Sequence, residues 1–290
     1  MKIVILGTGG RLGAALMHEY REKHDLAAFN RAQLDLANLD EVRGKLGAMN
    51  FDVLINAAAF TNVDACETER DRAFLINAEA PGVLAEICSE KDAKLIHFST
   101  DYVFDGQKRA PYTEEDPANP ISAYGESKLA GEKSVLAAGD GHLVVRVSWV
   151  FGPDRPSFVD AMIKRAQQEE KIDAIADKFS TPTYTHDIAN MLPNFFDRGA
   201  AVGILHFANA GKCSWQEYAQ WALDCCYDAG IPLNGKTVGA LKMSEMTNWL
   251  ARRPVYSVLS TAKYAELTGT TSRAWREAVA DYITRFYSKK

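Results

Sequence analysis

The stretch that decides the fold is MKIVILGTGGRLGAAL, residues 1–16. A short apolar run from Lys2 to Leu6 stops at a glycine-rich turn, and apolar residues then recur at helical spacing from Leu12 to Tyr20. This order predicts a buried strand, a tight turn and a helix. The turn itself contains a GxxGxxG pattern, which is typical of a backbone that receives the pyrophosphate of a dinucleotide at a helix N-terminus; its glycines are Gly7, Gly10 and Gly13.

The same alternation continues through the first half of the chain. Further short apolar runs predict strands at residues 26–29, 53–57, 94–98 and 142–149. Continuously apolar strands that are separated by helical stretches indicate a parallel sheet with helices on both faces. We therefore predict an α/β fold with a doubly wound parallel sheet in residues 1–152.

The second half has a looser pattern. It predicts strands at residues 171–175 and 204–208, and helices at residues 158–168, 186–196, 215–229 and 273–286. No linker rich in Pro, Gly or Ser separates the halves. Residues 153–290 are therefore expected to form a smaller, substrate-binding lobe packed directly on the first, with some segments returning to the first domain. The cleft between the lobes is the expected ligand site.

Composition excludes several classes of protein. Among 290 residues, 47% are apolar and 24% are charged, which is ordinary for a globular chain and not for a disordered one. The net charge of −5 argues against a nucleic-acid partner, and no apolar run approaches the roughly 20 residues of a membrane helix. The N-terminal apolar run is too short for a signal peptide, so we expect a cytoplasmic protein. The five cysteines and six histidines show no metal-ligand spacing, and no metal is expected.

The end of the second predicted strand bears on the choice of cofactor. An NAD site commonly has an acid there, whereas this chain reads Phe29-Asn30-Arg31. Arg31 could bind the 2′-phosphate of NADP, or it could be a solvated surface arginine. Asp35 could lie near the adenine, or it could cap the following turn. We expect NADP(H), with NAD(H) as the alternative.

The residues that predict chemistry are Tyr124 and Lys128, in the segment YGESK. Four residues apart on a helix, they share one face, where the ammonium can lower the pKa of the phenol. The tyrosine could then exchange a proton with a substrate oxygen near neutral pH. Thr100 follows the fourth strand, at the sheet edge where ligands of such folds bind, and could hydrogen-bond the same oxygen.

Nearly the whole chain resembles the extended short-chain dehydrogenase/reductases, and within them most closely the dTDP-4-dehydrorhamnose reductases. The resemblance rests on GTGGRLG (7–13), INAAAFTNVDACE (55–67), STDYVFDG (99–106), AYGESKLAGE (123–132), RVSWVFG (146–152), STPTYTHDIA (180–189) and RRPVYSVLSTAK (252–263). STDYVFDG followed by YGESKLAGE is far more specific than the glycine motif alone.

The resemblance implies a Rossmann-like fold and the NAD(P)H-dependent reduction of a nucleotide-linked 4-keto-6-deoxy sugar, namely dTDP-4-dehydro-L-rhamnose to dTDP-L-rhamnose. Tyr124 would protonate the nascent alkoxide, Lys128 would hold the nicotinamide ribose, and Thr100 would orient the carbonyl. The implied cofactor contacts are Gly7, Gly10, Arg11, Leu12, Gly13, Asn30, Arg31, Asp35, Ala57, Ala58, Tyr124 and Lys128. The implied substrate contacts are Thr61, Val63, Tyr102, Trp149 and Arg253, although Val63, Tyr102 and Trp149 could equally be packing residues.

Departures from the family pattern cluster in the substrate-binding half. They are the loop PDRPSF (153–158), Ser180 in place of a glycine, and Tyr256 in the arginine-proline segment. They leave the sugar and its nucleotide open. Ala15 replaces the glutamate that holds a bridging magnesium ion in some members, which favours a monomer or weak homodimer.

Three other functions share the pattern. A nucleotide-sugar epimerase has the same fold and YxxxK motif. A dehydratase would carry Asp-Glu after the strand-end threonine, where this chain has Asp101-Tyr102. A non-catalytic binding module, like the regulatory subunit of methionine adenosyltransferase, retains much of the same motif set.

Overall fold

A six-stranded parallel sheet forms the centre of the first lobe in the computed structural model, which describes residues 1–288. The strand order is β10-β5-β4-β3-β1-β2, with every neighbouring pair parallel. The bounds are β1 Lys2–Leu6, β2 Asp25–Phe29, β3 Val53–Asn56, β4 Lys94–Thr100, β5 Leu143–Val147 and β10 Gly203–His206. The doubly wound sheet predicted from the sequence is confirmed.

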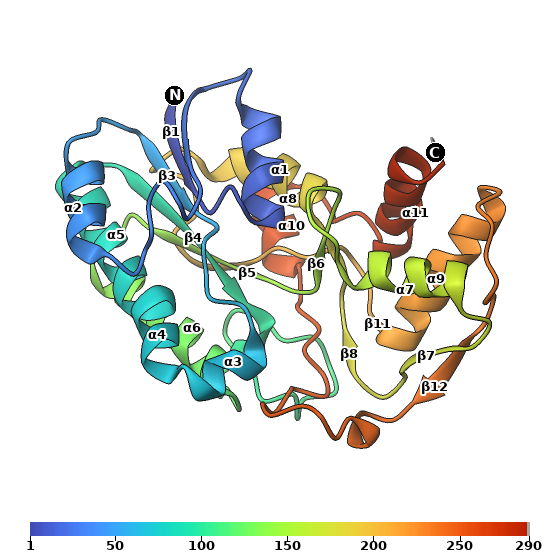
Figure 1. Ribbon diagram of the computed structural model, residues 1–290. Coiled ribbons are helices and arrows are strands. Elements are labelled where there is room, and N and C mark those ends of the chain that lie inside the picture. Colours follow the sequence, from blue (N-terminus) through green and yellow to red (C-terminus); the bar gives the residue numbers. More distant parts are fainter. Residues whose placement is uncertain (289–290) are drawn as a thin grey trace.

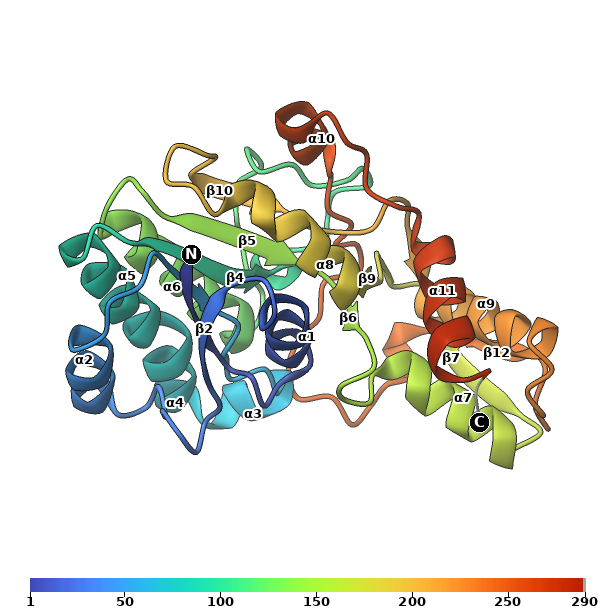
Figure 2. The same cartoon turned by 90° about the horizontal axis from the view of Figure 1, so that it is seen from above.

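Helices cover both faces of this sheet (Figures 1 and 2). Their bounds are α1 Arg11–Tyr20, α2 Leu39–Gly47, α3 Val63–Thr68, α4 Arg70–Phe74, α5 Ala80–Glu90, α6 Ala123–Ala137, α8 Thr185–Met191 and α10 Ala262–Thr268. Apolar side chains of α1 and α8 pack on one face with Ile55 and Phe98, and those of α2 and α5 pack on the other with Leu54 and Leu95. Successive strand residues therefore serve opposite cores, which explains why these strands are apolar throughout.

The second lobe has its own hydrophobic core, which includes residues of α7, α9 and α11. Its helices are α7 Phe158–Gln168, α9 Trp215–Asp228 and α11 Trp275–Phe286. Its strands pair two by two: β7 Ile172–Ile175 with β12 Val238–Leu241, β8 Phe179–Ser180 with β11 Cys213–Ser214, and β6 Val150–Phe151 with β9 Thr183–Tyr184. Ser214 and Glu217 form a capping box that fixes the start of α9.

The chain crosses between the lobes more than once. After β9, helix α8 packs against α1, and β10 then adds to the edge of the first sheet beside β5. Figure 2 shows this return, with α8 and β10 lying over the first lobe before the chain reaches α9.

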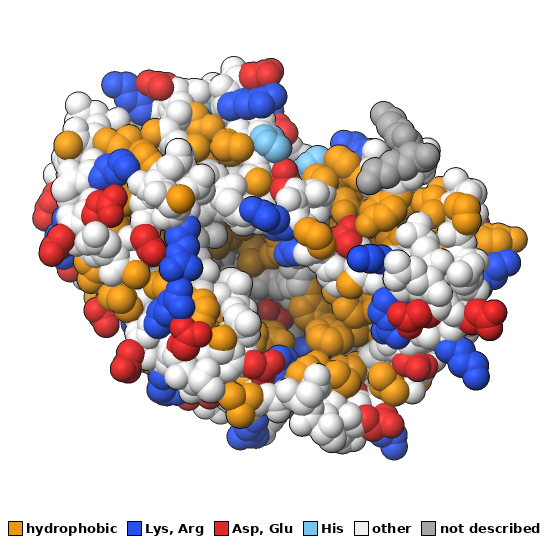
Figure 3. Space-filling view, in the orientation of Figure 1, with side chains coloured by type: hydrophobic (Ala, Val, Ile, Leu, Met, Phe, Trp, Pro, Cys, Tyr) orange, Lys and Arg blue, Asp and Glu red, His pale blue; other side chains and the backbone are white. Residues whose placement is uncertain are grey.

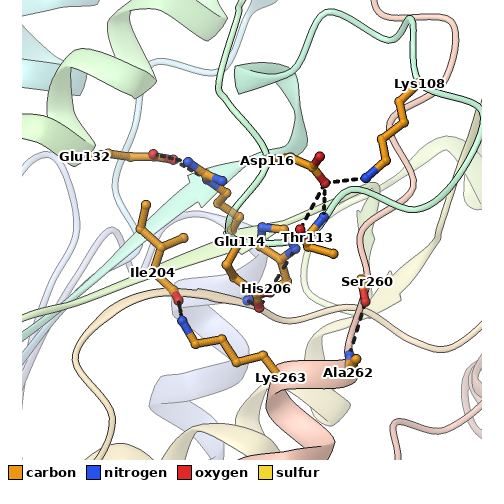
Figure 4. A network of polar contacts seen from close by, with 11 residues as sticks. Lys108, Thr113, Glu114, Asp116, Glu132, Ile204, His206, Ser260, Ala262 and Lys263 are labelled. Carbon is orange, nitrogen blue, oxygen red and sulfur yellow. Dashed lines mark hydrogen bonds and ion pairs between the residues drawn. The ribbon is translucent and has the colours of Figure 1, made fainter.

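A network of polar contacts holds β10 at the edge of the first sheet (Figure 4). Glu114 accepts a hydrogen bond from the backbone amide of His206 at 2.8 Å, and Lys263 Nζ donates to the carbonyl of Ile204 at 3.0 Å. Beside them, Arg146 donates two hydrogen bonds to the carboxylate of Glu132, at 2.9 and 2.7 Å. These contacts satisfy polar groups that burial at the sheet edge would otherwise leave unpaired.

Most predicted elements are confirmed within one or two residues of their ends. The predicted helix at residues 186–196 is instead α8 followed by a 3₁₀ turn, Leu192–Phe195, because Pro193 cannot donate a helical hydrogen bond. Strand β12 and helix α10 were not predicted. Among residues 1–288, no helix is long and apolar enough to span a bilayer.

Candidate active site

A cavity of about 780 Å³ lies at the carboxyl ends of β1, β3 and β4, where the strand order reverses. Figure 3 shows a hollow between the two lobes, with apolar side chains on its walls. Fourteen predicted site residues line the cavity, all from residues 1–152: Gly7, Gly10, Arg11, Leu12, Asn30, Arg31, Asp35, Ala57, Ala58, Thr61, Thr100, Tyr124, Lys128 and Trp149.

The glycine loop fits the diphosphate of a dinucleotide. Gly7 has φ +84°, and a Cβ at this residue would lie 2.6 Å from the amide nitrogen of Ala58. Gly13 does not line the cavity; a Cβ there would overlap the carbonyl of Gly7, so this glycine lets α1 pack closely on the turn. No side chain caps the N-terminus of α1, and its first turn contains no acid. Its amide groups are therefore available to an anion.

The loop after β2 is held by its own side chains. Asn30 Oδ1 accepts hydrogen bonds from the amides of Ala32 and Gln33, at 2.9 and 3.2 Å. Arg31 Nε donates to Asp35 at 3.0 Å, and the arginine side chain is 67% exposed. This ion pair and an amide hydrogen bond outweigh burial and lower the pKa of Asp35. Arg31 thus lies at the cavity wall. Within residues 1–288, its two terminal nitrogens make no hydrogen bond to the protein. The neighbouring carboxylate of Asp35 would repel a phosphate.

Two arginines join the glycine loop to the segment after β6. Arg11 donates to the carbonyls of Val150 and Arg155, each at 3.0 Å, and to that of Pro156. Arg155 in turn donates from Nε to the carbonyl of Gly9 at 2.9 Å, and it also lines the cavity. The guanidinium of Arg11, predicted as a cofactor contact, is therefore engaged with backbone. Sequence analysis missed Arg155, because its position depends on contact between distant segments.

Tyr124 lies in the first turn of α6, at the cavity wall. Ser122 caps this helix by accepting from the amide of Gly125. Burial raises the pKa of the phenol above its usual value, and a hydrogen bond with the neighbouring Thr100 hydroxyl offsets only part of this increase.

Lys128 is almost fully buried behind Tyr124. Its Nζ donates to the carbonyl of Phe98 at 2.7 Å and lies 3.3 Å from Nε2 of His97. Burial lowers the pKa of Lys128 to about 8, which Glu132 partly offsets. His97 is a further residue that sequence analysis missed, since its spacing from Lys128 carries no recognisable pattern.

Thr100 is held by a buried carboxylate. Its hydroxyl donates to Asp101 Oδ1 at 3.1 Å, while Asp101 Oδ2 accepts from the hydroxyls of Ser148, Ser180 and Ser257 at 2.9, 3.1 and 2.5 Å. Ser180, which departs from the family pattern, therefore has a hydrogen-bonding role here. This cluster ties the end of β4 to segments of the second half of the chain.

The predicted substrate contacts divide into two groups. Thr61 and Trp149 line the cavity, whereas Val63, Tyr102 and Arg253 do not. The ring of Tyr102 packs edge-on against Tyr124, with centroids 5.8 Å apart. Arg253 pairs with Asp64 at 2.7 Å and stacks over Trp249. Trp149 has φ +39°, a strained backbone at the cavity wall.

A buried cation lies between two of these aromatic rings. Lys178 Nζ is 5.2 Å from the ring centroid of Tyr102 and 5.6 Å from that of Trp149, and it donates to the carbonyl of Pro254 at 2.8 Å. Burial lowers its pKa to about 8. Cation–π contacts of this kind hold both rings in place. Elsewhere in residues 1–288, no three His, Cys, Asp or Glu side chains are grouped to hold a metal.

Comparison with known proteins identifies relatives over nearly the whole chain. A dTDP-4-dehydrorhamnose reductase of Mycolicibacterium smegmatis is 40% identical over 285 residues, which cover 97% of this chain and 85% of the relative. The crystal structure of such a reductase from Clostridium acetobutylicum superposes with a TM-score of 0.91 at 34% identity and covers 98% of this chain and 99% of that one. A Bacillus anthracis reductase in complex with NADP superposes with a TM-score of 0.89 at 32% identity, with the same coverage. The family of the RmlD substrate binding domain matches residues 1–288, and this chain belongs to it.

Proposed function

We propose that the protein reduces the 4-keto group of dTDP-4-dehydro-L-rhamnose to give dTDP-L-rhamnose, with NADP(H) or NAD(H) as cofactor. The observation that carries the proposal is that Thr100, Tyr124 and Lys128 line the same cavity as the glycine loop. The similar proteins named above are reductases of this kind, and the B. anthracis structure contains NADP.

The residues divide the work between binding and proton transfer. The glycine loop and the N-terminus of α1 would hold the cofactor diphosphate, and Lys128 would hold the nicotinamide ribose. When bound, the reduced nicotinamide supplies a hydride. Tyr124 donates its phenolic proton to the substrate oxygen, and the raised pKa of this phenol keeps the proton in place at neutral pH. The hydroxyl of Thr100 faces Asp101 in the free site, so it must rotate to orient a substrate carbonyl.

Measured turnover tests the proposal directly. NADPH oxidation is followed with a panel of dTDP-, GDP- and UDP-linked 4-keto sugars, and the products are identified. We expect stoichiometric oxidation, fastest with the dTDP-linked 6-deoxy sugar. An epimerase or dehydratase would convert a sugar without net consumption of cofactor. Absence of turnover, together with co-purification of a methionine adenosyltransferase, would favour the binding module.

Location and oligomeric state remain predictions within this proposal. We expect a cytoplasmic enzyme that is a monomer or weak homodimer. Ala15, which replaces the glutamate of metal-bridged dimers, is buried and supports this expectation. Light scattering during size-exclusion chromatography, with and without magnesium, tests it.

A further inference from the structure

One arginine from the second half of the chain lies at the cavity beside the glycine loop. Arg155 follows β6, in the loop PDRPSF that departs from the family pattern. Its Nε donates a hydrogen bond to the carbonyl of Gly9 at 2.9 Å, and both residues line the cavity. A segment that is distant in the sequence thus brings a guanidinium to the loop that fits the diphosphate of a dinucleotide.

The terminal nitrogens of Arg155 are free to bind a ligand. The hydrogen bond to Gly9 uses the Nε–H group alone, and in the part of the chain that the structure describes the two terminal nitrogens make no hydrogen bond and no ion pair. The neighbouring carboxylate of Asp154 lies toward α1, with its Oδ1 3.3 Å from Nδ1 of His18. The charge of Arg155 is therefore available to an anion in the cavity.

The other arginine of this link holds Arg155 in place. All three side-chain nitrogens of Arg11 donate to backbone carbonyls, which are those of Val150, Arg155 and Pro156. Arg155 is thus held twice, by Arg11 at its backbone and by Gly9 at its side chain. A side chain that is already positioned loses less conformational freedom when it binds a ligand.

The cavity has a second arginine, Arg31, whose surroundings are different. Arg31 follows β2 and pairs with Asp35, whereas Arg155 lies at the glycine loop and has no carboxylate partner among residues 1–288. We propose that Arg155 is a cofactor-binding residue whose terminal nitrogens bind the diphosphate that NADPH and NADH share, through charge-assisted hydrogen bonds. The proposal rests on the proposed function only for the presence of a nicotinamide dinucleotide in this cavity.

Two fragments of the cofactor test this assignment in the absence of any sugar. ADP-ribose contains the diphosphate without a 2′-phosphate, and adenosine 2′-monophosphate contains the 2′-phosphate without a diphosphate. Isothermal titration calorimetry of the full-length protein measures the Kd of each fragment and of NADPH and NADH. In Arg155→Met we expect the Kd for ADP-ribose to rise by about tenfold, the lower end for charge-assisted hydrogen bonds, because Arg155 is exposed.

The other ligands make the expected pattern specific. Arg155→Met should weaken NADPH and NADH by the same factor as ADP-ribose and leave adenosine 2′-monophosphate unchanged. Arg31→Ala should give the reverse, with weaker adenosine 2′-monophosphate and unchanged ADP-ribose. Added salt should weaken ADP-ribose more in the wild-type protein than in Arg155→Met, because only the wild type has the charge that salt screens.

Three further variants separate ligand binding from a purely structural role of the arginine. Arg155→Gln keeps an amide that can donate to the carbonyl of Gly9 but lacks the charge, so it should bind ADP-ribose as weakly as Arg155→Met. Arg155→Lys keeps the charge without the planar fork and should retain part of the affinity. Arg109→Met, at an exposed arginine that does not line the cavity, is the control and should bind every ligand as the wild type does.

Several outcomes would overturn the proposal. Unchanged affinity for ADP-ribose in Arg155→Met is one. Full affinity in Arg155→Gln is another, since the arginine would then act only through its bond to Gly9. A loss confined to NADPH and adenosine 2′-monophosphate would place Arg155 at the 2′-phosphate instead. If ADP-ribose and both cofactors bind as expected but no 4-keto sugar is reduced, the proposed function is wrong and the role of Arg155 stands.

Discussion

Burial raises the pKa of the Tyr124 phenol, the Thr100 hydroxyl lowers it, and Asp101 and Cys66 add to the increase, so that the pKa is raised overall. Tyr124→Phe removes the proton donor and keeps the ring. We expect kcat to fall by roughly 10² to 10⁴, the usual contribution of general acid catalysis, with little change in the Kd for NADPH. Steady-state kinetics and fluorescence titration measure the two quantities. Tyr227→Phe, at a residue that is 64% exposed, is the control. A kcat within a few-fold of wild type would remove Tyr124 from proton transfer.

We expect Arg31 and Asp35 together to set the choice between NADPH and NADH. The arginine would offer its terminal nitrogens to a 2′-phosphate, while the carboxylate that is paired with it would oppose the phosphate. Arg31→Ala should raise the Kd for NADPH by about tenfold and leave that for NADH nearly unchanged. Asp35→Asn should shift the preference further toward NADPH. Titrations of both cofactors in both variants test this. An equal loss of affinity for NADPH and NADH in Arg31→Ala would mean that Arg31 supports only the fold.

At the scale of elements, two glycines allow α6 to approach the rest of the first lobe. A Cβ at Gly125 would overlap the carbonyl of Tyr102, and a Cβ at Gly131 would overlap that of Asn77. Gly131→Ala should lower the free energy of unfolding by about 1 to 3 kcal/mol because the helix must shift. Gly44→Ala, in α2, meets nothing within 4 Å and should raise it by up to about 1 kcal/mol. Urea unfolding of both variants tests this contrast in sign.

The ion pair between Arg146 of β5 and Glu132 of α6 is buried, with side chains 3% and 1% exposed. Arg146→Met would leave a carboxylate without its partner in the interior. The expected loss is about 3 to 5 kcal/mol of unfolding free energy. Arg43→Met breaks the exposed pair with Glu86 and should cost less than about 1 kcal/mol. Similar losses in the two variants would mean that water reaches Glu132 in the native protein.

The sequence predicts elements well where periodicity and length agree, as in β1, α1 and α7. It does not reveal which sheet receives β10, because a strand of four residues with only Ile204 and Leu205 apolar fits an edge of either lobe. The two-residue strands β6, β8, β9 and β11 are too short for any periodicity to identify them. The same limit applies to the site. Thr100, Tyr124 and Lys128 lie in recognisable motifs. His97 and Arg155 lie in none, and Asp101, although it is part of STDYVFDG, contacts serines far away in the chain that the motif does not reveal.

For the whole molecule, three polar links join distant segments around the cavity. The first is formed by Arg11 and Arg155 at the glycine loop, and the second by Asp101 and its three serines at the end of β4. The third joins Asp64 of α3 to the segment before Arg253. Each link joins a residue of the first half of the chain to residues of the second half. The cavity is therefore held on several sides, which suits a site that must align a cofactor with a separate substrate.

The link at Asp64 can be measured by hydrogen exchange. Asp64 Oδ1 accepts from the amides of Leu250 and Ala251, at 3.0 and 2.8 Å, and its carboxylate pairs with Arg253. The arginine and these amides outweigh burial and lower the pKa of Asp64. A carboxyl group with a lowered pKa stabilises the folded state above its ordinary value, and that stabilisation is lost as the pH falls through the lowered pKa.

Asp64→Ala should therefore increase exchange at the Leu250 and Ala251 amides at neutral pH, relative to the rate expected from pH alone. In the wild-type protein the same increase should occur only in acid, as Asp64 takes up its proton. Asp64→Asn keeps an oxygen acceptor without the charge, so it should protect the amides partly and lose the dependence on pH. Asp52→Ala removes a carboxylate that binds the backbone of Lys2 on the far side of the lobe, and it should leave both amides protected. Unchanged protection in Asp64→Ala would show that this segment is held by the edge-to-face packing of Trp249 and Trp215 and not by the carboxylate.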